Sequence, residues 1–542
     1  MRLLLFSLTC LLFSSCSSFF LKNGLKEYEP TITSQASYRA ANQYQRDLLY
    51  LDALCVNTFP LIEEVFPAAR RQKVVDSLLV VLADPAMTEF EFAVTTRYYL
   101  GNFENQHTWM RGGTAYGLFP FILHPYGGRY YLANLQANFP LDLIGSEVTS
   151  LAGLSMAQVE KRVFPYFSAE NATSRRRQFG SYVCRPSILA FMGLIAEGDS
   201  LEIGFADGRS VTLPAVNSDE DINFRDIEYP KPVITEYRDH NYDLTLHPEQ
   251  DLGYLQFNKC YDLVDARATI PDYVRPFVVP LARVYLNRMA RKEKEFKNAP
   301  GGFEIDYSRP VFRDYLETSM AELTASGAKN LVIDLRNNGG GSLLLCLQLL
   351  YHLTDRDDLK GFDEFLYLSE AFRQTDKKEY RRFVKNYAEV NGAPPEMNKL
   401  YSRETTRKDQ DLFSEMKDVD SPYFIPSDRT VFDGKVMVLV GPGTGSAAAL
   451  FTTLLQDNEI ATVIGTTVGN NPTGATGLRP YSLPESGFTG SVASEYFVRP
   501  APEKGRFFEP DFWMENSLED LSAGRDAVFE KALELLHAAE VD

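Results

Sequence analysis

The stretch VMVLVGPGTGSAAAL, residues 436–450, decides the fold of this chain. Its five leading apolar residues predict a strand that is buried on both faces, and its alanine-rich end predicts a helix. Ser446 stands among small residues where the strand would turn into the helix. Such a turn presents a nucleophile at the mouth of a sheet. The plainer alternative is a small residue that a tight turn tolerates.

A second stretch, DLRNNGGGS at 334–342, repeats the order of strand, turn and helix. Reactive groups gather at the carboxyl ends of strands in open α/β sheets, and consecutive glycines let backbone N–H groups approach a reacting atom. A phosphate-binding loop would use similar physics, but the lysine of a P-loop is absent. We therefore expect an oxyanion hole formed by the N–H of Gly339 or Gly340 together with that of Ala447.

The alternation of strands and helices extends outward from these two stretches. Apolar runs at 252–261 and 462–465 are typical of further buried strands, and segments with helical spacing lie between them. This order predicts an α/β catalytic domain at about 250–538 whose mainly parallel sheet is covered by helices on both faces. Insertions are expected at about 264–310 and 356–430.

The N-terminal half divides into two regions. Apolar residues at helical spacing predict a helical bundle, assigned to 29–112. Short β-rich runs follow at 113–215, including a hairpin with Asp207 and Gly208 at its turn. A chain of 542 residues is longer than one hydrophobic core normally supports, so several domains are expected.

The first residues have the pattern of a targeting segment. The apolar stretch at 3–13 is too short to span a bilayer, and small residues lead from it into Cys16. Residues 12–16 resemble a bacterial lipoprotein processing site. We therefore expect 1–16 to be a lipoprotein signal peptide and a lipid on Cys16 to hold the protein at the cell envelope, facing the periplasm or in the outer membrane. An ordinary cleaved signal is the alternative.

The composition argues against a nucleic-acid partner and against a metal site. The formal net charge is -18 and the pI is about 5.0, whereas a nucleic-acid binder needs a concentrated basic face. The four cysteines beyond the signal have no CxxC spacing, so no metal ion or other cofactor is expected. The spacing assigns no disulfide pairing to them.

The two turn motifs together resemble those of the carboxy-terminal processing, or tail-specific, serine peptidases and their relatives around the tricorn core protease. The family's DLRxNxGG turn corresponds to 334–340, and its TxSAA motif corresponds to 444–448. The resemblance covers nearly the whole mature chain. It implies a ClpP/crotonase-like catalytic core, a helical N-terminal part, a PDZ-like module at 113–215, and a protein or peptide as substrate.

The chain departs from the usual family pattern at the catalytic base. Many of these peptidases use a lysine about 25 residues after the serine, but Asn471 stands there and no lysine occurs at 436–503. The glutamate that the family commonly has three residues after the serine is Ala449 here. A serine hydroxyl still needs an adjacent base, most often a histidine.

His107 is the expected base. It lies in NQHT, which matches the His-Thr pair of the family branch that uses histidine; a hydrogen-bonded structural histidine is the alternative. In that branch a glutamate orients the imidazole. Glu503 is the better match by its separation from Ser446, and Glu509 is the second candidate because it precedes the Pro-Asp pair at 510–511.

The sequence thus predicts a serine endopeptidase of the cell envelope that acts through an acyl-enzyme on Ser446. The missing lysine keeps open a catalytically silent protein that binds a peptide or another ligand on the same fold. An esterase with the same triad is a third hypothesis. The oligomeric state is left open.

Overall fold

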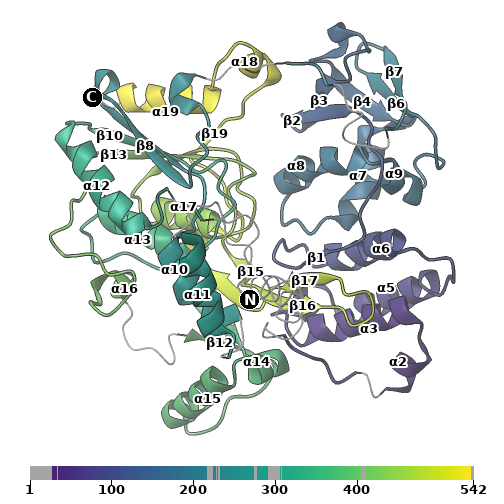
Figure 1. Cartoon of the computed structure of the whole chain (residues 1–542), viewed down its shortest axis with the longest axis horizontal. Coiled ribbons are helices and arrows are strands. Elements are labelled where there is room, and N and C mark those ends of the chain that lie inside the picture. Colours follow the sequence, from purple (N-terminus) through teal and green to yellow (C-terminus); the bar gives the residue numbers. More distant parts are fainter. Residues whose placement is uncertain are drawn as a thin grey trace, which may run out of the picture.

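The computed structural model describes residues 27–32, 35–216, 224–227, 229, 232–273, 277–290, 305–306, 308–403 and 411–538. The expected signal peptide and Cys16 lie outside these residues. Within them, no helix combines the length and the apolar character that crossing a membrane requires. Figure 1 shows a large sheet with its helices on one side of the molecule, and a helical region and a smaller β-rich region on the other.

A six-stranded sheet forms the centre of the predicted catalytic domain. Four of its five strand pairs are parallel, and only β8 and β9 run antiparallel. The strands lie in the order β19 (Phe512–Trp513), β14 (Thr462–Gly465), β13 (Lys435–Val440), β10 (Asn330–Asp334), β9 (Leu252–Phe257) and β8 (Tyr242–His247). The mainly parallel sheet predicted from the sequence is therefore present. It begins one strand earlier than predicted, because the antiparallel β8 precedes residue 250.

Helices cover both faces of this sheet, as continuous apolar strands require. In β13, Val436 and Val438 face one core and Met437 and Leu439 face the other. The first core is closed by α12 (Phe312–Ala325), α13 (Leu343–Leu353) and α17 (Ala447–Asp457), and the second by α19 (Ala527–Ala538). Figure 1 shows α19 on the opposite side of the strands from α13 and α17.

The N-terminal region is helical up to residue 101. Capping boxes at Asn42 and Thr88 satisfy free backbone N–H groups at the starts of two of its helices. The described helices are α2 (Ala36–Ala40), α3 (Gln43–Val56), α4 (Ile62–Val65), α5 (Ala68–Val81) and α6 (Glu89–Gly101). Their shared core also takes in Tyr481 and Phe488 from the far end of the chain, so this region packs directly against the catalytic domain.

The β-rich region, called the β module below, is an antiparallel sheet with helices packed on it. The predicted hairpin is present, with Gly208 at a φ of 84° in its turn. The strands follow the order β2 (Phe121–Tyr126), β3 (Arg129–Leu135), β4 (Glu147–Leu151), β6 (Leu201–Phe205) and β7 (Ser210–Leu213), with β5 (Leu154–Ser155) paired to β4. The helices are α7 (Met156–Val163), α8 (Ala172–Val183) and α9 (Pro186–Phe191).

Two small sheets join distant parts of the chain. In the first, β1 (Trp109–Arg111) pairs with β17 (Thr489–Val492), which pairs with β16 (Arg479–Ser482). The second has the order β12 (Leu400–Ser402), β11 (Asp363–Tyr367), β18 (Glu495–Val498) and β15 (Gly474–Thr476). The predicted insertion at 356–430 therefore contributes two strands to a sheet that it shares with the catalytic domain.

The remaining helices of the two insertions lie outside the central sheet. They are α10 (Leu263–Tyr273) and α11 (Val279–Ala290) in the first insertion, and α14 (Glu370–Thr375), α15 (Lys377–Asn391) and α16 (Ser414–Lys417) in the second; α18 (Leu518–Ser522) precedes α19. Figure 1 shows α14 and α15 extending away from the body of the molecule.

Candidate active site

Ser446 stands in a sharp turn between β13 and α17. Its backbone has φ 47° and ψ -125°, a conformation that residues other than glycine rarely adopt. Holding such a conformation costs about 1–3 kcal/mol, and strained residues of this kind cluster at functional sites. The turn lets the chain pass from strand to helix while the Ser446 side chain stands clear of both elements, as in other strand-to-helix turns that carry a nucleophile.

Comparing two variants tests the strain at this turn. Ser446→Ala and Ser446→Gly both remove the hydroxyl, but only glycine adopts a φ of 47° without strain. We expect the glycine variant to be more stable than the alanine variant by about 1 kcal/mol. Thermal unfolding followed by circular dichroism gives the two midpoints. Equal midpoints, or a lower midpoint for the glycine variant, would contradict a strained turn.

The structure brings His107 to this serine. Nε2 of His107 lies 3.3 Å from Oγ of Ser446, although 339 positions separate the two residues. The separation is slightly longer than an ideal hydrogen bond, as catalytic pairs often are without substrate. His107 is only 6% exposed, and burial lowers the pKa of its imidazole to about 4. The ring is therefore neutral at physiological pH and can accept a proton.

A tight turn before β1 holds His107. Oδ1 of Asn105 accepts hydrogen bonds from the backbone N–H of His107 (3.1 Å) and from the hydroxyl of Thr108 (3.1 Å). Nδ2 of Asn105 donates to the carbonyl of Ala475 at 2.7 Å, and the N–H of Ala493 donates to the Thr108 hydroxyl at 3.1 Å. The segment around His107 is thus fastened to the C-terminal part of the catalytic domain.

The two glutamates expected to orient His107 do not reach it. Glu503 and Glu509 are both exposed, and Nδ1 of His107 is buried with no hydrogen-bond partner among the described residues. The buried ion pair of Arg499 and Asp457, at 2.6 Å, fixes the chain just before Glu503 and leaves that glutamate on the surface. At Glu509 it is the backbone carbonyl that turns inward, since it accepts a hydrogen bond from Gln456 at 3.0 Å.

The glycine turn lies against the serine. A Cβ on Gly340, whose φ is 106°, would come within 2.6 Å of Cβ of Ser446, so only glycine fits there. The N–H of Gly340 already donates to Oδ1 of Asn338 at 2.9 Å, which removes it from the expected oxyanion hole. No hydrogen bond within the described residues engages the N–H of Gly339 or Ala447. These two groups remain available to an oxyanion.

Three further polar residues, which were not among the predicted site residues, surround the pair. Oδ1 of Asn470 accepts two hydrogen bonds, from the backbone N–H of Ser446 at 2.5 Å and from Nε2 of Gln106 at 2.9 Å. The partly buried carboxylate of Glu170 accepts hydrogen bonds from the backbone N–H groups of Gln106 and Asn471. The polar run GNNPTG at 469–474 was the available signal for Asn470. Glu170 and Gln106 carry no local pattern that distinguishes them from surface residues.

Ser446 and His107 open into a cavity of about 500 Å³. Its lining also includes Gly339, Gly341, Leu478, Arg111 and Arg177. Among the described residues, the lining contains no lysine that could take the place of the usual family base.

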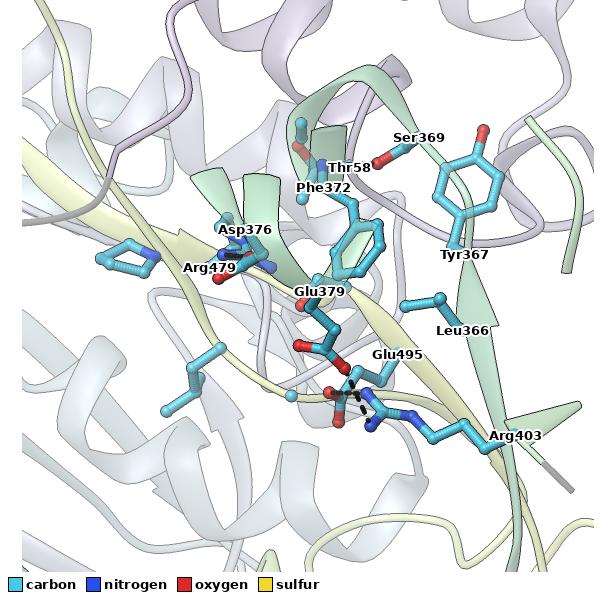
Figure 2. Close-up of a pocket in the computed structure, with 15 residues that line it drawn as sticks. Thr58, Leu366, Tyr367, Ser369, Phe372, Asp376, Glu379, Arg403, Arg479 and Glu495 are labelled. Atoms are coloured by element: carbon cyan, nitrogen blue, oxygen red, sulfur yellow. Dashed lines mark hydrogen bonds and ion pairs between the residues drawn. The ribbon is translucent and has the colours of Figure 1, made fainter. Parts of the chain in front are cut away.

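A second cavity, of about 370 Å³, lies beside the small sheet that contains β11. Its charged side chains pair with one another: Arg479 with Asp376 at 2.7 Å, and Arg403 with Glu495 at 3.1 Å. Figure 2 shows these pairs, with Glu379 close to Arg403. The described residues that line it include no histidine, whereas those of the first cavity include both Ser446 and His107.

Comparisons with known proteins support an active site at the two turn motifs. Residues 307–504, which contain both turn motifs, match the model of peptidase family S41. No curated protein matches the chain. The fold is similar to that of mature CPAF, with 16% identity, a TM-score of 0.54 and coverage of 91% of this chain and 95% of that chain. The structure of mature CPAF complexed with lactacystin aligns with 16% identity and a TM-score of 0.55, covering 91% and 97%.

A third solved structure is less similar. The photosystem II D1 C-terminal processing protease aligns with 13% identity and a TM-score of 0.34, covering 90% of this chain and 99% of that chain. The family assignment rests on the match of residues 307–504, which form a domain of peptidase family S41. The two turn motifs predicted this family, and the chain therefore carries a serine-type peptidase domain.

Proposed function

We propose that this serine peptidase is an endopeptidase of the histidine-using, tail-specific branch, with His107 as general base. Ser446 attacks the scissile carbonyl, and His107 takes the proton from its hydroxyl and returns it to the leaving amine. The N–H groups of Gly339 and Ala447 hold the negative oxygen of the tetrahedral intermediate. The observation that carries the proposal is the 3.3 Å approach of a neutral, buried imidazole to a hydroxyl on a strained turn.

The β module supports a second part of the proposal. We infer that it is PDZ-like and brings a peptide to the active site by strand addition or by holding its carboxyl end. Its segment before β2 contains Pro120, which has no N–H to offer a carboxylate. A role in holding the site together therefore fits this module at least as well as a role in reading peptide ends.

The catalytic proposal is tested by covalent labelling. A fluorophosphonate reacts with an activated serine and needs no knowledge of the natural substrate. Incubation of the full chain with the probe, followed by peptide mapping, is expected to place the adduct on Ser446. An unlabelled protein would favour the silent, ligand-binding alternative. Hydrolysis of matched peptide and ester substrates would then separate a peptidase from an esterase.

The envelope location rests on the sequence around Cys16 and is tested separately. Cells that express the chain and are fed a labelled fatty acid are expected to transfer the label to it and to retain the protein in the membrane fraction. Cys16→Ala should lose both the label and the membrane association. A lipid-free wild-type protein in the soluble fraction would contradict the anchor. Stable anchoring needs several acyl chains, and Cys16 would carry all of them. Its replacement should therefore release nearly all of the protein from the membrane fraction.

A further inference from the structure

Glu170 belongs to the β module, yet its carboxylate is hydrogen-bonded to the loop that carries His107 and to the loop at 470–471, which contacts the turn of Ser446. It lies between a short 3₁₀ turn at Phe164–Tyr166 and α8. Oε1 accepts hydrogen bonds from Nδ2 of Asn105 at 3.1 Å and from the N–H of Gln106 at 3.4 Å. Oε2 accepts the N–H of Asn471 at 2.7 Å. One carboxylate thus bridges segments that lie more than 360 positions apart in the sequence.

The first of these loops carries His107 itself, and the second is hydrogen-bonded to the turn that carries Ser446. Gln106 directly precedes His107, and Asn471 directly follows Asn470, which accepts the N–H of Ser446 at 2.5 Å. The side chain of Gln106 also donates to Asn470 at 2.9 Å. Glu170, Gln106, Asn470 and Asn471 therefore close a ring of hydrogen bonds around the approach of His107 to Ser446.

Neighbouring contacts fasten the β module to the same loop. The side chain of Asn171 donates to the carbonyl of Val468 at 2.8 Å, and the hydroxyl of Ser174 donates to the carbonyl of Gly469 at 2.7 Å. These bonds place the start of α8 against the loop and leave Glu170 with three N–H donors pointed at it. A carboxylate is the one common side chain that only accepts, so it matches this set of donors.

We propose that Glu170 is a positioning residue of the peptidase, through which the β module holds the imidazole of His107 at reacting distance from the hydroxyl of Ser446. The proposal rests on the catalytic roles given above to these two residues. Glu170 is hydrogen-bonded to neither of them, since its partners are Asn105, Gln106 and Asn471. Its effect is on geometry, and a displacement of about 1 Å between reacting groups can cost on the order of 100-fold in rate.

The ionisation of Glu170 gives this role a pH dependence. Burial raises the pKa of its carboxyl to about 7, opposed by the N–H groups of Asn471 and Gln106 and by the charge of Arg506. The other charged groups nearby are Arg175 and Glu104, which pair with each other at 3.1 Å. His107, also close, is neutral until far lower pH because its pKa is about 4.

The direction of the pH dependence follows from the hydrogen bonds that the ionised carboxylate of Glu170 accepts. Above a pH of about 7 the carboxylate is ionised and makes its strongest bonds to the three N–H donors. As the pH falls through this value, the added proton weakens them, and the catalytic pair loosens. The labelling rate of the wild type should therefore fall in two separate steps, near pH 7 from Glu170 and near pH 4 from His107.

Glu170→Gln tests the proposal in the full-length protein. Glutamine keeps the size of the side chain, but its NH₂ group faces one of the N–H donors, so the variant resembles the protonated form permanently. We expect the limiting rate of fluorophosphonate labelling to fall about 10- to 100-fold, with little change in the probe concentration needed for half the limiting rate. The step near pH 7 should disappear, and the step near pH 4 should remain.

Two further variants make the result specific. Glu170→Asp keeps the charge and should retain the upper pH step with part of the rate. Glu160→Gln is the matched control, because Glu160 is another partly buried glutamate of the β module. It accepts a hydrogen bond from Tyr130 at 2.7 Å and pairs with Arg176 at 3.7 Å, and both of these partners belong to the β module. It should label at the wild-type rate.

Two outcomes would overturn the proposal. The first is a Glu170→Gln variant that labels at the wild-type rate with the upper step unchanged. The second is an equal loss in Glu160→Gln, which would reveal a general weakening of the β module. An unlabelled wild type would instead refute the catalytic proposal itself, so the two failures are distinguishable.

Discussion

Ser446→Ala is expected to abolish both fluorophosphonate labelling and peptide hydrolysis. Ser446 carries the hydroxyl that is paired with His107, so its removal leaves no activated nucleophile to attack the carbonyl. In serine peptidases, removal of the nucleophile lowers the limiting rate by on the order of a millionfold. The variant should fold normally, because alanine is smaller than serine and meets the same backbone constraint. Intact-mass measurement after incubation with the probe gives the labelled fraction directly.

Ser342 supplies the matched control for this experiment. It lies in the wall of the same cavity and carries the other serine hydroxyl there. Nε2 of His107 is bonded to Ser446 and not to Ser342. Ser342→Ala should therefore keep most of the labelling. Labelling that survives in Ser446→Ala and disappears in Ser342→Ala would transfer the nucleophile to the glycine turn and refute the assignment.

His107→Ala has the second-largest expected effect, a fall of about 1,000-fold in the limiting rate of labelling and hydrolysis. General-base catalysis of this kind contributes about 100- to 10,000-fold. The loss should not fall to the lower end of that range, because the described residues that line the cavity include no lysine or second histidine that could replace the imidazole. Steady-state hydrolysis with a fluorogenic peptide library measures it once a cleaved sequence is found.

Chemical rescue separates a missing base from a damaged fold. The alanine variant leaves space where the buried ring stood, so imidazole added to the buffer should restore part of the rate. His124→Gln is the control, because His124 lies in the β module and its Nε2 contacts the carbonyl of Asn516 at 3.0 Å, outside the active site. A His107→Ala variant that labels as fast as the wild type would remove His107 from the mechanism.

His107 is oriented differently from the base of a usual triad, because its Nδ1 has no hydrogen-bond partner among the described residues. Triads usually place a carboxylate against this atom, which fixes the tautomer and stabilises the charged ring. Here the ring is held from its backbone by Asn105 and by the pairing of Trp109 with Ser491. The nearest carboxylate in the hydrogen-bond network, Glu170, acts on the loops and not on the ring. The low pKa of His107 follows from the lack of a charged partner as well as from burial.

Local sequence was sufficient for the parts of this protein that depend on neighbours in the chain. The strand, tight turn and helix at 436–450 follow from an apolar run, small residues and an alanine-rich segment, and they carry Ser446. The glycines at 339–341 likewise predict that the backbone approaches another group closely, and the structure shows this approach between Gly340 and Ser446. His107 was found because its neighbour Thr108 completes a short motif and few histidines compete with it.

Only the tertiary structure decided which polar groups share the site with them. Glu503 and Glu509 have suitable positions in the sequence but face solvent, because the ion pair of Arg499 and Asp457 and the contact to Gln456 set the direction of the chain there. Glu170 has no motif, and its role arises where three distant segments pack together. Hydrogen-bond partners depend on distances and angles between such segments, whereas strands, turns and helices depend mainly on the order of residues along one segment.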